Sequence, residues 1–294
     1  IVFDELSLAG LVTPEGRIDA GRLPNFARLQ RLSTWYREAT TVSTSTHKAI
    51  LAILTGTFPN DESLPVYSEY PLLANSHDIH AKESVSRLCP ESVCDKSGKS
   101  AQTRFDPGTL YEDAWYVWLH SVLPVGIGQR YLPPISNGWR DFRRKDSAHS
   151  KRLNDNQYQI LLRAIIKNGV QPEIPDLANI LDTSYKDAIA SLRMSSGASV
   201  NYLHLLQPHH PWIRFPDGSA YNGSSLPGLM ASQTWRDDQN LADQGVLQYA
   251  LQVEYVDHLL GGVLDALEES GRLSETLLIV LADHGLAIAP GQSL

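Results

Sequence analysis

The stretch that decides the fold is Leu277-Leu278-Ile279-Val280-Leu281-Ala282-Asp283-His284-Gly285, near the end of the chain. It has a counterpart at the opposite end, Ile1-Val2-Phe3-Asp4-Glu5-Leu6. Each reads as a buried apolar strand that ends in acidic or imidazole side chains. Because the carboxyl ends of neighbouring parallel strands open onto one crevice, the two ends of the chain are predicted to meet there.

Between these ends, helical and strand-like segments alternate. Helices are predicted over 25–38, 47–54, 153–167, 175–193 and 239–270, with Gly271 ending the last, and strands over 39–46 and 199–206. This alternation is typical of an α/β fold with a doubly wound, mostly parallel central sheet flanked by helices. Residues 60–150 are weakly periodic and rich in Pro, Ser and Tyr, so they are predicted to form a loop-rich insertion in one catalytic domain, 1–294.

Composition excludes several classes of protein. The 294 residues include 25 basic and 33 acidic side chains, a net charge of -8, which argues against general nucleic-acid binding. No apolar run approaches the roughly 20 residues of a spanning helix. The first residue falls inside a predicted strand and the chain stops nine residues after Gly285, so we expect a fragment truncated at both ends, with any anchor in missing segments.

The two cysteines, Cys89 and Cys94, leave two interpretations. They could be a free or metal-binding pair, although two thiols are too few for a structural zinc site. We favour a short-loop disulfide, which would place the domain in an oxidising compartment.

Asp4, Asp283 and His284 offer the carboxylate and imidazole donors that a divalent metal accepts. Two adjacent ligands can reach one ion if the strand ends and the chain turns, and Gly285 permits that turn. By itself, Asp-His-Gly could be a surface turn. Together with Asp4 and Glu5 at another strand end, a metal site is the stronger hypothesis.

Thr46 lies where a hydroxyl-rich run meets the apolar helix that Thr55-Gly56 ends. Its oxygen would face the positive end of the helix dipole and free backbone N–H groups, which favour anions. A metal at Asp4 and Asp283 could make that hydroxyl a nucleophile. The alternative is that Thr46, or a neighbouring hydroxyl, only caps the helix.

Three histidines lie in or just after the strand predicted at 199–206: His204 lies within it, and His209 and His210 follow it. Neutral imidazole binds metal, and protonated imidazole holds a phosphoryl oxygen or protonates a leaving group. For His204 a buried structural role is equally supported. His209 is favoured as functional because it lies just beyond an inner strand, although the His209-His210 pair could be a solvated turn.

Taken in order, these residues resemble the alkaline phosphatase superfamily, specifically its sulfatase-like branch. The similar segments are Val2 to Glu5 (the paired-acid metal motif), Pro24 to Leu29 (the following helix), Ile53 to Gly56 (the end of the nucleophile helix), His204 with His209 to Trp212 (the substrate-facing histidines), and Tyr255 to Gly261 with Asp283 to Gly285 (the last helix and metal strand). Counting back from Thr55-Gly56 places the family's nucleophile at Thr46.

One departure from the family pattern narrows the chemistry. True sulfatases carry Cys or Ser at the nucleophile, followed by Pro, Ser and Arg, and convert it to formylglycine. Here Thr46 cannot give formylglycine, and Ile50 stands at the arginine position. The pattern is more similar to the Thr-nucleophile enzymes, lipoteichoic acid synthases and phosphoethanolamine transferases.

The resemblance implies an extracytoplasmic, metal-dependent phosphoryl-group transferase or phosphodiesterase, anchored to a membrane by segments outside this chain. One divalent ion would bind Asp4, Thr46, Asp283 and His284, with manganese or zinc favoured over calcium or magnesium. Glu5 would be a minor ligand or would contact the ligands without binding the ion. Catalysis would fall to Thr46 and His209, and substrate binding to the set His204, His210 and Lys48. The partners would be a phosphate-ester donor, lipid or small molecule, and a hydroxyl acceptor or water.

Two alternatives remain. One is a sulfate- or phosphate-ester hydrolase of small molecules, which differs in passing the group to water. The other is a non-catalytic envelope-binding domain, for which so complete a set of ligand residues would be unusual.

Overall fold

The computed structural model describes residues 1–58, 70–82, 89, 107–123, 132, 185–194, 197–221, 226–230 and 232–293. The chain divides into two compact units, one formed by Ile1–Cys94 with Tyr158–Leu294 and the other by Asp95–Gln157. The second unit, of which α6 (Pro107–Val122) is described, overlaps most of the predicted insertion. The helix predicted over 153–167 lies outside the described residues.

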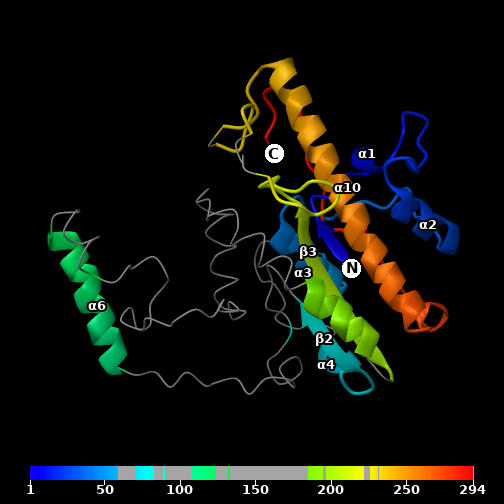
Figure 1. Cartoon of the computed structure of the whole chain (residues 1–294), viewed down its shortest axis with the longest axis horizontal. Helices are drawn as coiled ribbons and strands as arrows, with labels where there is room; N and C mark the ends of the chain where they lie inside the picture. Colours follow the sequence, from blue (N-terminus) through cyan, green and yellow to red (C-terminus); the bar gives the residue numbers. More distant parts are fainter. Residues whose placement is uncertain are drawn as a thin grey trace. The chain divides into compact units, whose positions relative to one another are not determined.

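The first unit is built on a four-stranded sheet in the order β2-β3-β1-β4. Its strands are β1 (Val2–Asp4), β2 (Asp78–Lys82), β3 (Ser199–Pro208) and β4 (Leu281–Ala282). Every pairing is parallel, and helices flank the sheet, which confirms the predicted α/β fold (Figure 1). The short helices of this unit are α1 (Leu8–Leu11), α4 (Tyr70–Leu73) and η1 (Leu273–Glu275). Strand β2 falls within 60–150, so that stretch is not loop alone.

The two ends of the chain meet as adjacent strands. Val2 pairs with Leu281 and Phe3 with Ala282, and Phe3 is completely buried. Strand β4 is shorter than predicted, and the run before it is not buried throughout: Leu277 is 85% exposed, whereas Leu278 packs against the core. That alternation is typical of an edge strand with one solvated face.

Helix α10 (Gln239–Glu269) packs against β3 and supplies more of the core than any other described element. Asp238 accepts a hydrogen bond from the Leu241 N–H at its start, and Gly271, with φ of 69°, ends it as predicted. Residues sharing its buried side include Tyr249, Val253, Val256, Leu260 and Leu264. Leu247 of the same helix is 68% exposed.

Helix α2 (Pro24–Leu32) packs across α10 (Figure 1). A Cβ at Gly261 would lie 2.7 Å from the Asn25 side chain, so glycine allows this close approach. Asn25 lies inside the helix, and Asp257 of α10 caps the helix by accepting from the Asn25 and Phe26 N–H groups. The helix ends at Leu32, six residues before the predicted end at residue 38. Just beyond this end, the Ser33 hydroxyl donates to the Leu29 carbonyl.

The β-branched residues of the hydroxyl-rich run before α3 (Thr46–Thr55) favoured a strand over 39–46. The structure shows that this run does not form one. Its hydroxyls bond to nearby backbone: Thr41 Oγ1 donates to the Ser43 carbonyl, and Ser43 Oγ accepts from the Ser45 N–H. Such local bonds compete with a strand ladder. The segment instead delivers Thr46 to the start of a helix.

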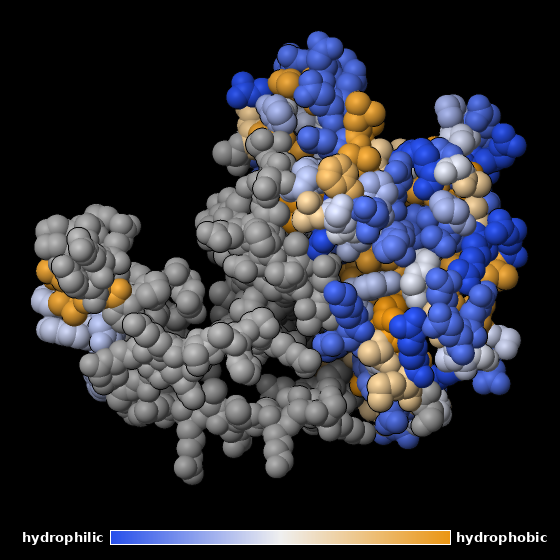
Figure 2. All heavy atoms as spheres, viewed as in Figure 1, coloured by the Kyte–Doolittle hydropathy of each residue, from blue (hydrophilic) through white to orange (hydrophobic). Residues whose placement is uncertain are grey.

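The described surface around α10 is largely hydrophilic on the face that Figure 2 shows. Within the described ranges, no helix has the length and apolar character needed to cross a bilayer.

Candidate metal centre

Three side chains converge at the carboxyl edge of the sheet. Asp4 ends β1, and Asp283 and His284 follow β4 directly, so the β1–β4 pairing brings them together. One potential ligand atom from each lies within 4.8 Å of the others. Asp4 and Asp283 are 0% and 1% exposed, which makes this a buried pair of acids.

Each of these acids keeps one oxygen without a hydrogen bond from the described residues. Asp283 Oδ1 accepts from the Glu5 N–H at 3.1 Å and the His284 N–H at 2.6 Å, while Asp283 Oδ2 and Asp4 Oδ2 have no such donor. In the described part of the chain, the basic group near both carboxylates is His284 Nε2, at 3.8 Å from Asp4 Oδ1 and 3.5 Å from Asp283 Oδ2, contacts that are ion pairs only when the imidazole is protonated. Burial, followed by the charges of Asp283 and Glu5, raises the pKa of Asp4 well above its usual value. Buried acids with spare oxygens and a neighbouring imidazole fit a divalent cation.

Thr46 points into the same cluster. It is the first residue of α3, and its Oγ1 lies 3.3 Å from Asp4 Oδ1 and 3.0 Å from His284 Nε2. Ser45, not Thr46, occupies the N-cap position, and its side chain makes no capping hydrogen bond. The geometry therefore directs the Thr46 hydroxyl at the predicted ligands and not at the helix backbone.

The protonation of His284 follows from its neighbours. Its Nδ1 lies 2.9 Å from the Gly285 carbonyl oxygen, which can only accept, so Nδ1 carries the proton. In the neutral imidazole, Nε2 then presents a lone pair to the Thr46 hydroxyl. That nitrogen can bind a metal or accept the hydroxyl proton.

The turn that shapes this edge occurs at Glu5, not at Gly285. Glu5 has a φ of 63°, and the pairing of β1 with β3 shifts register between Phe3 and Asp4. A left-handed non-glycine residue is costly and persists only where its surroundings hold it. Here Tyr249 holds it by donating to the Glu5 carbonyl at 2.7 Å and accepting from the Ser7 N–H at 2.8 Å.

Sequence reasoning missed Tyr249. Its hydroxyl on the apolar stripe of α10 was the available signal, since a buried Tyr usually finds a hydrogen-bond partner.

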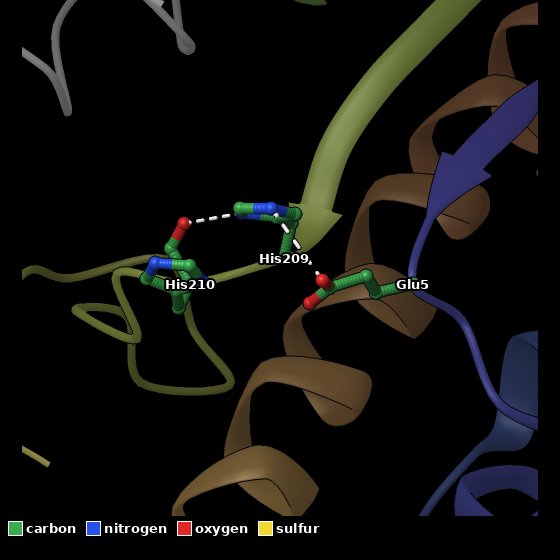
Figure 3. A group of neighbouring side chains, drawn as sticks. All are labelled: Glu5, His209 and His210. Carbon is green, nitrogen blue, oxygen red and sulfur yellow. Dashed lines mark hydrogen bonds and ion pairs between the residues drawn. The ribbon is translucent and has the colours of Figure 1, made fainter. Parts of the chain in front are cut away.

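Glu5, His209 and His210 form a second cluster, shown in Figure 3. Glu5 reaches from the end of β1 toward His209, which follows β3, and Glu5 Oε1 lies 3.4 Å from His209 Nε2. His209 Nδ1 is hydrogen-bonded to the His210 carbonyl, and the two rings stack with centroids 4.5 Å apart. Burial, and then the charge of His209, lowers the pKa of His210 to about 3. The structure thus brings both residues together with Glu5, which the sequence analysis had placed at the metal.

The remaining predicted residues are less directly placed. His204 is buried within β3, and its burial lowers its pKa to about 4, so it is neutral near pH 7. Lys48 lies in the first turn of α3, two residues beyond Thr46. Cys94 lies outside the described residues, so the Cys89–Cys94 disulfide stays a prediction.

Comparison with known protein families agrees with a sulfatase-like assignment. A family model described as Sulfatase matches residues 136–293. The chain belongs to the sulfatase family. The matched span contains β3, α10 and β4, and with them His209 and the Asp283-His284 pair. Asp4 and Thr46 lie before it: Asp4 joins through the β1–β4 pairing, and Thr46 joins at the start of α3. No curated protein and no solved structure gives a significant match. Membership identifies a sulfatase-like hydrolase or transferase, a class that generally binds a divalent metal.

Proposed function

We propose that this sulfatase-family chain is a metal-dependent phosphoryl-group transferase or phosphodiesterase that works through a covalent phosphothreonine at Thr46. The observation that carries the proposal is the position of Thr46 Oγ1, within 3.3 Å of Asp4 and 3.0 Å of His284 at the start of α3. A threonine cannot become formylglycine, so the hydroxyl itself must serve as the nucleophile in any covalent mechanism.

The ligand set for a divalent ion is Asp4, Thr46, Asp283 and His284. Their spare buried oxygens and unprotonated Nε2 fit such an ion. When bound, the ion supplies charge neutralisation and a lower pKa for the Thr46 hydroxyl. The mixture of carboxylate and imidazole donors favours manganese or zinc over calcium or magnesium.

The first half-reaction transfers the phosphoryl group to the chain. Thr46 Oγ1 forms a bond to phosphorus as the bond to the leaving oxygen breaks, and the hydroxyl proton has Asp4 Oδ1 within reach, because the Nε2 lone pair of His284 is assigned to the ion. The free N–H groups at the start of α3 face the incoming anion. His209 holds a phosphoryl oxygen or protonates the leaving oxygen.

The second half-reaction removes the group from Thr46. An acceptor hydroxyl or water attacks phosphorus, its proton is taken up at the site, and the Thr46 oxygen leaves and is reprotonated. His204, His210 and Lys48 contribute to substrate binding. His204 does so as a neutral imidazole, since its pKa is lowered to about 4.

The substrates of this proposal are a cell-envelope lipid or glycan, and the setting is extracytoplasmic, with membrane association through segments outside this chain. A disulfide between Cys89 and Cys94 would agree with an oxidising compartment.

The test uses Thr46→Ala and Thr46→Ser with a chromogenic phosphodiester. Thr46→Ala should lower kcat at least about 10³-fold while the fold survives, and Thr46→Ser should retain part of the rate. Mass spectrometry of quenched wild-type protein should find phosphate on the peptide containing residue 46. An alanine variant with near-normal turnover would remove Thr46 from the mechanism.

A second candidate function is hydrolysis of small sulfate or phosphate esters, favoured by the family match itself. A transferase and a hydrolase differ in which molecule receives the phosphoryl group. Adding glycerol should divert product from free phosphate to glycerol phosphate only in a transferase. A non-catalytic binding domain would show neither turnover nor phosphothreonine.

A further inference from the structure

We propose that Glu5, His209 and His210 form a second divalent-cation site, distinct from the ion bound by Asp4, Thr46, Asp283 and His284. Its catalytic role rests on the proposed function, but its occupancy can be measured without any assay of activity. The two sites share one strand end, because Asp4 and Glu5 are consecutive residues at the end of β1.

The left-handed turn at Glu5 separates the two acids. Asp4 faces Asp283 and His284, whereas the Glu5 side chain reaches the end of β3 (Figure 3). One potential ligand atom each from Glu5, His209 and His210 lies within 4.8 Å of the others. Strand order places β3 beside β1, so this cluster lies at the same carboxyl edge as the first.

The cluster is rich in acceptors. His209 Nδ1 is hydrogen-bonded to the His210 carbonyl, which can only accept, so Nδ1 carries a proton. His209 Nε2 faces Glu5 Oε1 at 3.4 Å. Glu5 Oε2 is buried without a hydrogen bond from the described residues, on a side chain only 6% exposed, and His210 Nδ1 is in the same condition. Unpaired buried acceptors are costly, and one cation would satisfy them together.

The simpler alternative is an ion pair between a protonated His209 and Glu5. A proton on His209 Nε2 would satisfy Glu5 Oε1. It would leave Glu5 Oε2 and His210 Nδ1 buried and unpaired. A cation accounts for the third member of the cluster, and the ion pair does not.

Binding requires a small rearrangement. The rings of His209 and His210 stack at an interplanar angle of 20°, so their in-plane lone pairs run side by side. Metal–nitrogen bonds of about 2.1 Å need the rings to splay until their lone pairs converge. Rotation of side chains in the loop after β3 supplies this without moving the sheet.

The donor set indicates which ion binds. Two imidazoles and one carboxylate form a three-ligand site typical of catalytic zinc, with a fourth position open to water or substrate. With His209 bound to the second ion, that ion would hold the substrate oxygen that the proposed function assigns to the His209 side chain itself. Paired ions that clamp one phosphoryl group are an established arrangement.

The experiment measures zinc stoichiometry. The 294-residue chain is stripped with chelator, dialysed against Zn²⁺ and analysed by elemental mass spectrometry. Wild type should hold two equivalents, and Asp283→Asn, Glu5→Gln and His210→Ala should each hold one. His80→Ala, an exposed histidine of β2, is the matched control and should hold two.

A wild-type protein with one equivalent, lost in Asp283→Asn and unchanged in His210→Ala, would overturn the second site and leave the proposed function intact. Two equivalents retained in both Glu5→Gln and His210→Ala would also overturn it, because the second ion would then lie elsewhere. Two equivalents with the expected losses, but no phosphothreonine at residue 46, would keep the second site and refute the proposed function.

Discussion

Two buried aspartates in this molecule have opposite surroundings. Asp257 of α10 is 3% exposed, and its two oxygens accept from the Asn25 N–H, the Asn25 side chain and the Phe26 N–H. Asp283 is 1% exposed, yet Oδ2 has no hydrogen-bond donor among the described residues, and Asp4 lies close by. Burial alone therefore does not distinguish a structural acid from a functional one. The completeness of its hydrogen bonds does.

The largest expected effect is on metal binding at Asp283. Asp283→Asn should lower the metal affinity of that site at least about 100-fold. The reason is that it removes a ligand, and mutating residues that only hydrogen-bond to ligands already lowers metal affinity about 10–100-fold. Without metal, the same variant should be as stable as wild type or more so, since Asn Oδ1 can still accept from the Glu5 and His284 N–H groups while a buried charge disappears. Titration calorimetry and chelator-treated denaturation measure the two effects, with exposed Asp237→Asn as control.

Asp257→Asn should behave in the opposite way. The amide nitrogen would face the Asn25 donors, so the free energy of unfolding should fall by about 1–3 kcal/mol. Metal affinity should stay near that of wild type. Urea denaturation with and without chelator checks this, and equal stability of the variant and wild type would remove the capping role.

The pH dependence of the metal-free protein extends the comparison to Asp4. Burial and the charges of Asp283 and Glu5 raise the pKa of Asp4 above 3.8, so the folded state binds more protons than the unfolded state above about pH 4. The contribution of Asp4 to stability should therefore be fully present below that pH and be lost as pH rises through the raised pKa. Melting temperatures across pH 4–8 in chelator should show this decline, and Asp4→Asn should flatten it. A decline of equal slope in Asp4→Asn would assign the effect to other groups.

The smallest expected effect comes from Tyr249, which supports the turn between the two clusters. Tyr249→Phe leaves the Glu5 carbonyl and Ser7 N–H without their hydrogen bond, which should cost about 1–2 kcal/mol. Tyr36→Phe, at a residue 76% exposed, should cost nothing measurable by thermal denaturation. Equal melting temperatures for the two variants would show that Glu5 holds its left-handed backbone without this support.

Local patterns predicted the elements that have strong periodicity and clear ends. Helix α10 matches its prediction within one residue, because its apolar spacing is sustained and Gly271 ends it. The run at 39–46 failed, because β-branched hydroxyl residues satisfied their local backbone before any strand could form. Helix α2 ended early for a similar reason at Ser33.

The sequence by itself determined the parallel α/β class, the meeting of the chain ends, and the grouping of Asp4, Asp283 and His284. These follow from apolar strands that end in polar side chains, a pattern local to each segment. Tertiary structure alone decided that Glu5 turns away from Asp4 to join His209 and His210, that Asp257 caps α2, and that Leu247 faces solvent. Each depends on which surface packs against another element, and no pattern within one segment carries that information.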